Sequence, residues 1–120
     1  MKMNGMFKSI GALALVALSL AGCEMPEIEI GDPDFSQVKM GSYEGYWDGG
    51  LVKVRVAVEA EDGRVGRITI LLHDCGTGKP AEAIVDSVID AQSLRVDVVS
   101  GATHSSKVIL RAIENALTGS

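Results

Sequence analysis

The sequence predicts a single small α+β domain in which an antiparallel sheet packs against two amphipathic helices. Between Gly41 and His73, apolar residues alternate with charged ones, which is typical of strands with one solvated face. Residues 81–92 and about 105–117 instead repeat their apolar residues at helical spacing. Because the strands come first and the helices follow, the order favours an α+β fold, and 120 residues leave room for one core.

The strand region divides into three runs, which cover residues 43–48, 51–58 and 65–73. Gly49 and Gly50 separate the first two runs, so a hairpin is expected there. A second turn is expected at residues 61–64. In the third run, one face is predicted to carry Ile68, Ile70 and Leu72.

Two helices are expected after the strands. The first covers residues 81–92, and its apolar stripe consists of Ile84, Val85, Val88 and Ile89. The second begins at about Ser105 and ends at Leu117, and Ser105 and Ser106 stand where N-caps are favoured. The segment over residues 94–99 between the two helices is short and apolar.

The first residues carry the pattern of an export signal. Lys2 and Lys8 precede a continuous run of small and apolar residues at positions 10–21. About 12 residues are too few to span a bilayer, which usually takes about 20. The run therefore indicates a secretory signal peptide over residues 1–22.

Leu20-Ala21-Gly22-Cys23 follows this run and resembles the bacterial lipobox. The resemblance implies that the Cys23 thiol is acylated and becomes the mature N-terminus, so that the protein is anchored to the cell membrane and faces outside the cytoplasm. Two or more acyl chains anchor stably, since each buried methylene contributes about 0.8 kcal/mol. An ordinary signal peptide with an incidental cysteine is the alternative.

Residues 24–40 hold five acids and two prolines and have little apolar periodicity. We therefore expect residues 23–40 to form a lipidated tether with a reach of roughly 20–25 Å as flexible coil. Residues 41–120 are then expected to form the folded domain.

Charge and residue usage exclude several kinds of partner. Loss of residues 1–22 removes two of the 11 basic residues and none of the 16 acids, so the net charge changes from −5 to −7 and nucleic acid is not expected as a partner. His73 and His104 are the only histidines and no Cys/His cluster accompanies them, so no metal or haem site is expected. Once Cys23 is acylated, Cys75 has no second cysteine to pair with.

Residues 97–103 have the pattern D-x-x-S-G-A-T, just ahead of the last expected helix. Five specified positions make chance matches rare, at roughly a few per million starting points. The motif resembles the flavinylation motif of the FMN-binding domain family, which includes subunits of the sodium-pumping NADH:quinone reductase and of related electron-transport complexes. The similarity extends over about residues 41–118.

The resemblance implies that Thr103 carries FMN through a phosphoester, which a separate magnesium-dependent flavin transferase forms from FAD. Gly101 permits a positive φ and Ala102 keeps the neighbourhood small. Ser100 offers a hydroxyl for the turn. Asp97 either hydrogen-bonds amides of the turn or is read by the transferase.

The phosphate on Thr103 is expected beside the free amides of Ser105, Ser106 and Lys107, because a helix N-terminus favours anions. The Lys107 side chain is expected to add a cation. His104 is expected to be exposed, close to the phosphate.

Asp74 to Pro80 reads DCGTGKP, which lacks the first glycine of a phosphate loop and places a proline after the lysine, so a nucleotidase is excluded. Whether this segment lies near the flavin stays open. Cys75 contacts the flavin, forms an intermolecular disulfide, or is a plain, partly buried thiol. The aromatic residues of the first strand, Tyr43, Tyr46 and Trp47, either stack on the flavin or pack in the core.

The function implied is that of an electron carrier, because isoalloxazine supplies the redox chemistry. Its expected partners are the flavin transferase, redox proteins or a membrane electron-transfer complex, and the membrane itself. No catalytic residue is assigned, since no triad or paired-carboxylate cleft is evident. A non-redox interaction lipoprotein is the main alternative, and a reductase with its own small substrate is the third.

Overall fold

The computed structural model describes residues 27–74 and 78–119. The expected signal peptide, Cys23 and Cys75 lie outside these residues, so the predictions on them are not tested by the structure. Within the described ranges, no helix combines the length and the apolar character that a membrane crossing requires.

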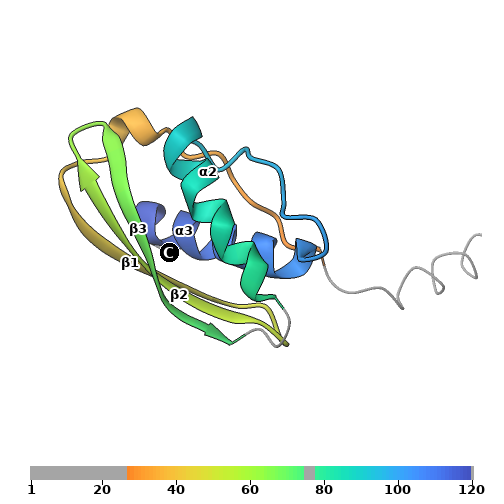
Figure 1. The fold of residues 1–120 in the computed structure, drawn as a ribbon. Helices are drawn as coiled ribbons and strands as arrows, with labels where there is room; N and C mark the ends of the chain where they lie inside the picture. The colour runs from red at the N-terminus through yellow and green to blue at the C-terminus, as the bar shows by residue number, and fades with distance from the viewer. Residues whose placement is uncertain (1–26, 75–77, 120) are drawn as a thin grey trace, which may run out of the picture.

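Three antiparallel strands form one sheet in the order β1-β2-β3 (Figure 1). Their bounds are Gly41–Asp48 for β1, Lys53–Glu61 for β2 and Arg64–Asp74 for β3. The alternation that predicted the strands is clearest in β2, where Val54, Val56 and Val58 are fully buried. The predicted α+β fold is confirmed, including the hairpin at Gly49 and Gly50.

Two bulges interrupt the pairing of β3 with β2. The register skips Gly66 near one end and Leu71 near the other, so each is an extra residue on β3. The bulge at Leu71 reverses the alternation: Leu72 pairs with the outward-facing Arg55, whereas His73 pairs with the buried Val54. The prediction that Leu72 shares the buried face of Ile68 and Ile70 is therefore wrong.

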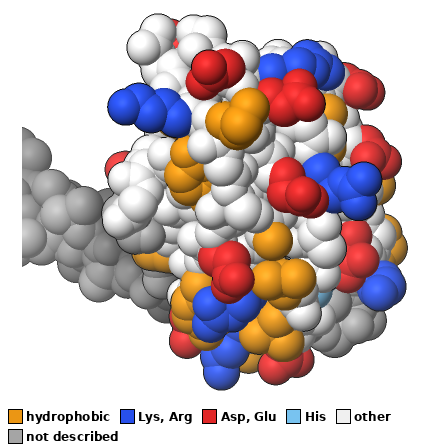
Figure 2. Space-filling view, turned by 90° about the vertical axis from the view of Figure 1, so that its left-hand side faces the viewer, with side chains coloured by type: hydrophobic (Ala, Val, Ile, Leu, Met, Phe, Trp, Pro, Cys, Tyr) orange, Lys and Arg blue, Asp and Glu red, His pale blue; other side chains and the backbone are white. Residues whose placement is uncertain are grey.

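Both helices lie on the same face of the sheet (Figure 1). A 3-10 turn, η2 (Lys79–Ala83), leads into α2 (Ile84–Ala91), and α3 covers Thr103–Thr118. The α2 stripe is as predicted, with Ile84 and Val88 buried and its two other members partly buried. Mixed charged and apolar side chains occupy the uncovered face of the sheet (Figure 2).

A glycine in β1 fixes how closely α3 approaches the sheet. A Cβ atom added to Gly45 would lie within 3 Å of the Ala112 carbonyl oxygen, the Ala116 amide nitrogen and the Ala116 methyl group. The backbones of β1 and α3 are therefore in direct contact at this point. Asn115 on α3 strengthens this contact, because its side-chain amide donates to the Tyr46 carbonyl oxygen at 2.8 Å.

The segment before β1 is folded onto the domain. Phe35 in the short 3-10 helix η1 (Phe35–Gln37) is only 3% exposed, and Ile28 and Ile30 pack partly against the core. The Gly63 amide also donates to the Val38 carbonyl oxygen at 2.9 Å. The prediction of a flexible tether is therefore wrong for residues 27–40, the part of this segment that the structure describes. Its apolar side chains pack in the core although they are not spaced with the periodicity of a strand or a helix.

Candidate functional site

The D-x-x-S-G-A-T motif forms a tight turn that leads directly into α3. The Ala102 amide donates to the Val99 carbonyl oxygen at 3.0 Å, and Gly101 has a φ of +80°, as at the third position of a type II turn. A Cβ on Gly101 would meet no atom within 4 Å. Backbone conformation, rather than space, therefore accounts for this glycine.

The side chain of Ser106 closes the turn from inside. Its buried hydroxyl accepts from the Val99 amide at 3.0 Å and donates to the Ala102 carbonyl oxygen at 2.8 Å. Ser105 is also buried but makes no side-chain hydrogen bond to the described residues. The prediction that these serines stand at the N-cap is wrong: the helix begins two residues earlier and Ala102 occupies that position without a side-chain cap.

Thr103 is the first residue of α3, and its side chain is exposed. Its hydroxyl makes no hydrogen bond to any atom in the described part of the chain. The first three amides of the helix, on Thr103, His104 and Ser105, have no helical acceptor. The Ser106 amide already donates to the Ala102 carbonyl oxygen at 2.9 Å, and the helical ladder that starts there takes up the Lys107 amide. Of the three amides that were expected to be free, only that of Ser105 is.

Two cations lie on the same side of α3 as Thr103. Lys107 and Arg111 follow Thr103 at intervals of four residues, which places the three side chains in one row along the helix. Lys107 Nζ lies 3.7 Å from a carboxylate oxygen of Glu27, and its side chain is 32% exposed. Arg111 pairs with Glu114 at 2.7 Å.

A cavity of about 650 Å³ opens beside this row. It lies between the first turns of α3, the β1–β2 hairpin and the segment before β1; its lining consists of Glu27, Ile28, Glu29, Trp47, Asp48, Gly49, Gly50, Leu51, His104 and Arg111. The Arg111 guanidinium lies over the Trp47 ring, 4.7 Å from its centroid. The volume is in the range of ligand pockets, and Trp47 gives it an aromatic wall.

His104 links the start of α3 to the hairpin. Its Nε2 lies 3.0 Å from the Gly49 carbonyl oxygen, so the ring is half-buried and not exposed as predicted. A Cβ on Gly49 would lie 2.5 Å from a Val108 methyl group, which shows how closely the two elements pack. The neighbour of Thr103 thus belongs to the wall of the cavity.

The other aromatic and motif residues lie away from this cavity lining. The Tyr43 hydroxyl donates to the Lys39 carbonyl oxygen at 2.7 Å, and the Tyr46 ring lies under Arg55 on the uncovered face of the sheet. Among the three aromatic residues of β1, only Trp47 lines the cavity. Asp97 and Ser100 are exposed and make no hydrogen bond within the described ranges, so the turn does not use the Asp97 carboxylate.

A second polar cluster lies at the C-terminal end of β3, the end of the sheet that also carries the β1–β2 hairpin, and was not anticipated from the sequence. His73, whose side chain is 2% exposed, holds a carboxylate oxygen of Glu82 at 2.9 Å through Nδ1, and Lys79 lies 3.5 Å from the same oxygen. The hydrogen bond from His73 lowers the pKa of the Glu82 carboxyl from its ordinary value, while burial opposes that shift. His73 Nε2 is buried and has no hydrogen-bond partner among the residues that the structure describes. The cluster ties β3 to η2 on either side of residues 75–77.

No group of three or more His, Cys, Asp or Glu residues in the described ranges is placed to hold a metal ion. Of the predicted site residues, Thr103 and Lys107 lie one turn apart on the same side of α3. The sequence did not predict the cavity or the contact of His104 with Gly49, because each joins elements that are distant in the sequence. It did not predict the buried hydrogen bond of Ser106 either, because that bond depends on the exact start of the helix.

Similarity to known proteins shows the family of this chain. A protein described as uncharacterized in Treponema pallidum (strain Nichols) is 34% identical over 85 residues, which cover 68% of this chain and 24% of that protein. The chain thus spans about a quarter of that relative's length. No solved structure matches it. The family model described as the FMN-binding domain matches residues 45–118, from the middle of β1 to the end of α3. The chain therefore belongs to the FMN-binding domain family, which supports FMN as its cofactor.

Proposed function

We propose that this protein carries FMN as a phosphoester on Thr103 and acts as an electron carrier, anchored by lipid on Cys23 and facing outside the cytoplasm. The observation that carries the proposal is the position of Thr103. It combines an exposed hydroxyl with no hydrogen bond to the described residues, the first turn of a helix and a neighbour, His104, that lines a cavity with an aromatic wall.

The surroundings of Thr103 fit a phosphate group. The three amides at the start of α3 are not used by the helix, and the helix dipole favours an anion there by about 0.3–1 kcal/mol. Lys107 lies one turn further along the same row. Its pairing with Glu27 involves a largely exposed carboxylate, so it is weak enough for a phosphate to replace it.

The cavity fits a flat aromatic ring system. Trp47 provides a surface for stacking, Ile28 and Leu51 add apolar contacts, and Arg111 and His104 provide polar groups at the wall. FMN, when bound, supplies the redox chemistry, and these residues set its polarity and exclude water.

Attachment of the flavin requires a separate transferase. A threonine hydroxyl is a weak nucleophile that needs an activating base. The nearest histidine along the chain, His104, contacts the Gly49 carbonyl oxygen, and Asp97 makes no hydrogen bond to Thr103. The described residues offer the acceptor hydroxyl and leave its activation to the enzyme that delivers FMN.

Peptide mapping of protein co-expressed with a flavin transferase tests the attachment. The FMN mass is expected on Thr103, and Thr103→Ala is expected to abolish covalent fluorescence in denaturing gels while the far-UV spectrum and cooperative melting are kept. Ser105→Ala is the matched control, because it removes a neighbouring hydroxyl that makes no hydrogen bond within the described ranges, and it should keep full labelling. Flavin retained in Thr103→Ala would move the site to another hydroxyl. A wild-type protein that never takes up flavin would favour the non-redox interaction lipoprotein.

The lipid anchor is tested separately. Cys23→Ser is expected to shift the protein from the membrane fraction to an unprocessed or soluble form. Normal processing and membrane retention in that variant would contradict the anchor and leave the flavin proposal standing.

A further inference from the structure

We propose that the mature protein presents the cavity beside Thr103 to the bilayer surface, because a linker of only three residues connects the lipidated cysteine to the rim of the cavity. This inference rests on the lipid anchor proposed above. It adds which side of the domain faces the membrane and which kind of partner can reach the cofactor.

This linker is short because the folded part of the chain already includes Glu27. Three residues, Glu24, Met25 and Pro26, separate Cys23 from Glu27, which already lines the cavity. Four Cα-to-Cα steps span at most about 14 Å when fully extended. Glu27, on the rim of the cavity, therefore stays within about 14 Å of the acylated cysteine.

The segment after Glu27 is bound to the rest of the domain, so the linker cannot become longer without breaking contacts of the fold. The Gly31 amide donates to the Glu114 carboxylate at 3.0 Å, and Asp32 pairs with Arg95 at 3.1 Å. Ile28 and Ile30 pack partly against the core between these contacts and Glu27. Release of this segment exposes apolar surface, which costs about 25 cal/mol per Å².

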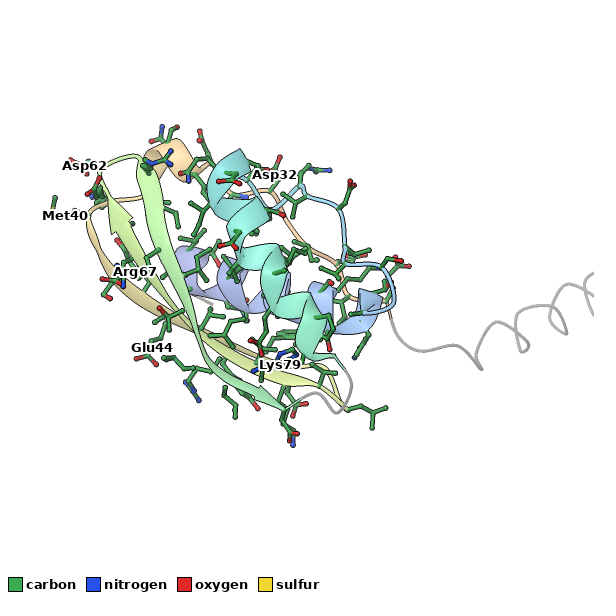
Figure 3. All side chains as sticks on the ribbon, viewed as in Figure 1. Asp32, Met40, Glu44, Asp62, Arg67 and Lys79 are labelled. Carbon is green, nitrogen blue, oxygen red and sulfur yellow. The ribbon has the colours of Figure 1, made fainter. Side chains whose placement is uncertain are left out.

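The end of the domain that carries Glu27 also carries the β1–β2 hairpin and the start of α3, since all three line one cavity. Leu51 at the hairpin tip is 83% exposed, and an apolar side chain in this position is suited to contact lipid at the interface. Met40 lies just before the opposite end of β1, a strand of eight residues or about 25 Å (Figure 3). With Glu27 held near the bilayer, the Met40 end points away from it.

This orientation determines the kind of redox partner. The cavity beside Thr103 opens at the end that faces the bilayer, whereas the uncovered face of the sheet and the Met40 end face the aqueous compartment. Electrons therefore enter or leave the flavin through a partner embedded in or held at the membrane. A freely diffusing soluble protein would be excluded from that side by the lipid surface.

Fluorescence quenching by lipids measures the orientation directly, because Trp47 is the single tryptophan of the chain and lines the cavity. Full-length protein is expressed without flavin transferase, isolated from the membrane fraction as the acylated form, and reconstituted into phosphatidylcholine vesicles that contain a lipid brominated near the headgroup. Trp47 is expected to be quenched more than in vesicles without bromine. Insertion of 20 Gly/Ser residues between Pro26 and Glu27 is expected to remove most of this quenching.

The matched controls move the single tryptophan in a Trp47→Phe background. Leu51→Trp, at the hairpin tip, is expected to be quenched at least as strongly as Trp47. Met40→Trp, at a position that is 70% exposed, is expected to be quenched several-fold less. Equal quenching at positions 40 and 51, or an unquenched Trp47 in vesicle-bound protein, would overturn the orientation while the lipid anchor stands. Absence of the protein from the membrane fraction would overturn the anchor and the orientation together.

Discussion

The two helices lie on the same face of the sheet, yet they begin in opposite ways. The first is preceded by η2, which has a proline at its start and Glu82 in its first turn, and Asp86 stands in the first turn of α2 itself. The second, α3, begins at Thr103 with no acidic residue in its first turn, and neither helix has a side-chain cap. The chain therefore places acidic residues in the first turns of η2 and α2 and none in the first turn of α3.

The helices also differ in how they are held. Helix α3 touches the backbone of β1 at Gly45, and the Ser106 hydroxyl locks the turn before it. The η2 turn that leads into α2 is tied to β3 by the His73–Glu82 pair. This comparison teaches that the start of α3 is rigid and has an unsatisfied preference for negative charge, which suits a position that receives a phosphate.

The largest effect is expected where α3 meets β1. Gly45→Ala places a Cβ atom against the backbone of Ala112 and Ala116, so α3 must move away, and we expect a loss of about 3 kcal/mol or more in the free energy of unfolding. Urea denaturation followed by circular dichroism measures it. Gly66→Ala is the control, because a Cβ there meets no atom within 4 Å and the change should be small. Equal losses would show that the close approach of α3 is unimportant.

A smaller effect is expected where the turn is locked. Ser106→Ala leaves the Val99 amide without its acceptor, which should cost about 1–3 kcal/mol, measured by the same denaturation. The adjacent Ser105 is also buried but makes no side-chain hydrogen bond in the described ranges, so Ser105→Ala should change stability by less than about 0.5 kcal/mol. If the two variants lose the same amount, the buried hydroxyl does not rigidify the start of α3.

The His73–Glu82 pair, which joins η2 to β3, predicts that the stability of the domain depends on pH. Because the pKa of Glu82 is lowered from its ordinary value of 4.5, its contribution is fully present above that value and is lost as the pH falls through the lower value of the folded state. Glu82→Gln should therefore cost about 1 kcal/mol at neutral pH and flatten the acid side of the stability profile below pH 4.5. The control is Glu59→Gln, which breaks an exposed pair with Arg67. An unchanged acid limb in Glu82→Gln would contradict the assignment.

The smallest effect is expected when a negative charge is added to the first turn of α3, which has no acidic residue. Thr103→Asp in protein without flavin places a negative charge in the first turn of α3 and should raise stability by about 0.3–1 kcal/mol relative to Thr103→Asn. Thermal melting at low and high ionic strength measures the difference, which should shrink in salt. A lower stability for the Asp variant at low salt would show that the start of α3 does not favour anions.

Most of the fold could be predicted because its elements have regular periodicity. The alternation in β2 and the four-residue recurrence in α3 each show a buried face without reference to the rest of the chain. The bulge at Leu71 could not be predicted in this way, since one extra residue reverses the alternation and the sequence on either side stays apolar. Residues 27–40 were assigned to a tether for a related reason: Phe35 is buried by tertiary packing and has no periodic neighbours.

The candidate site was predictable where a motif carries it. The positive φ expected of Gly101 is found, and Thr103 is exposed, whereas the attachment of FMN to it stays a prediction. The start of α3 was misplaced because N-cap preferences favoured the serines, whereas the bonds of Ser106 to Val99 and Ala102 place it inside the helix. The cavity could not be predicted from local patterns because Glu27, Trp47 and His104 meet only in the folded chain.

The bond between Gly31 and Glu114 joins residues 83 positions apart, and α3 covers strands that precede it in the chain. Contacts of such long range slow folding, since the chain between them must be ordered first. A chain that lacks α3 leaves the apolar face of its sheet uncovered, so we expect the domain to stay unfolded until its last helix is available. On the export route proposed above, this delay would keep the chain unfolded during passage through the membrane and permit folding only on the far side.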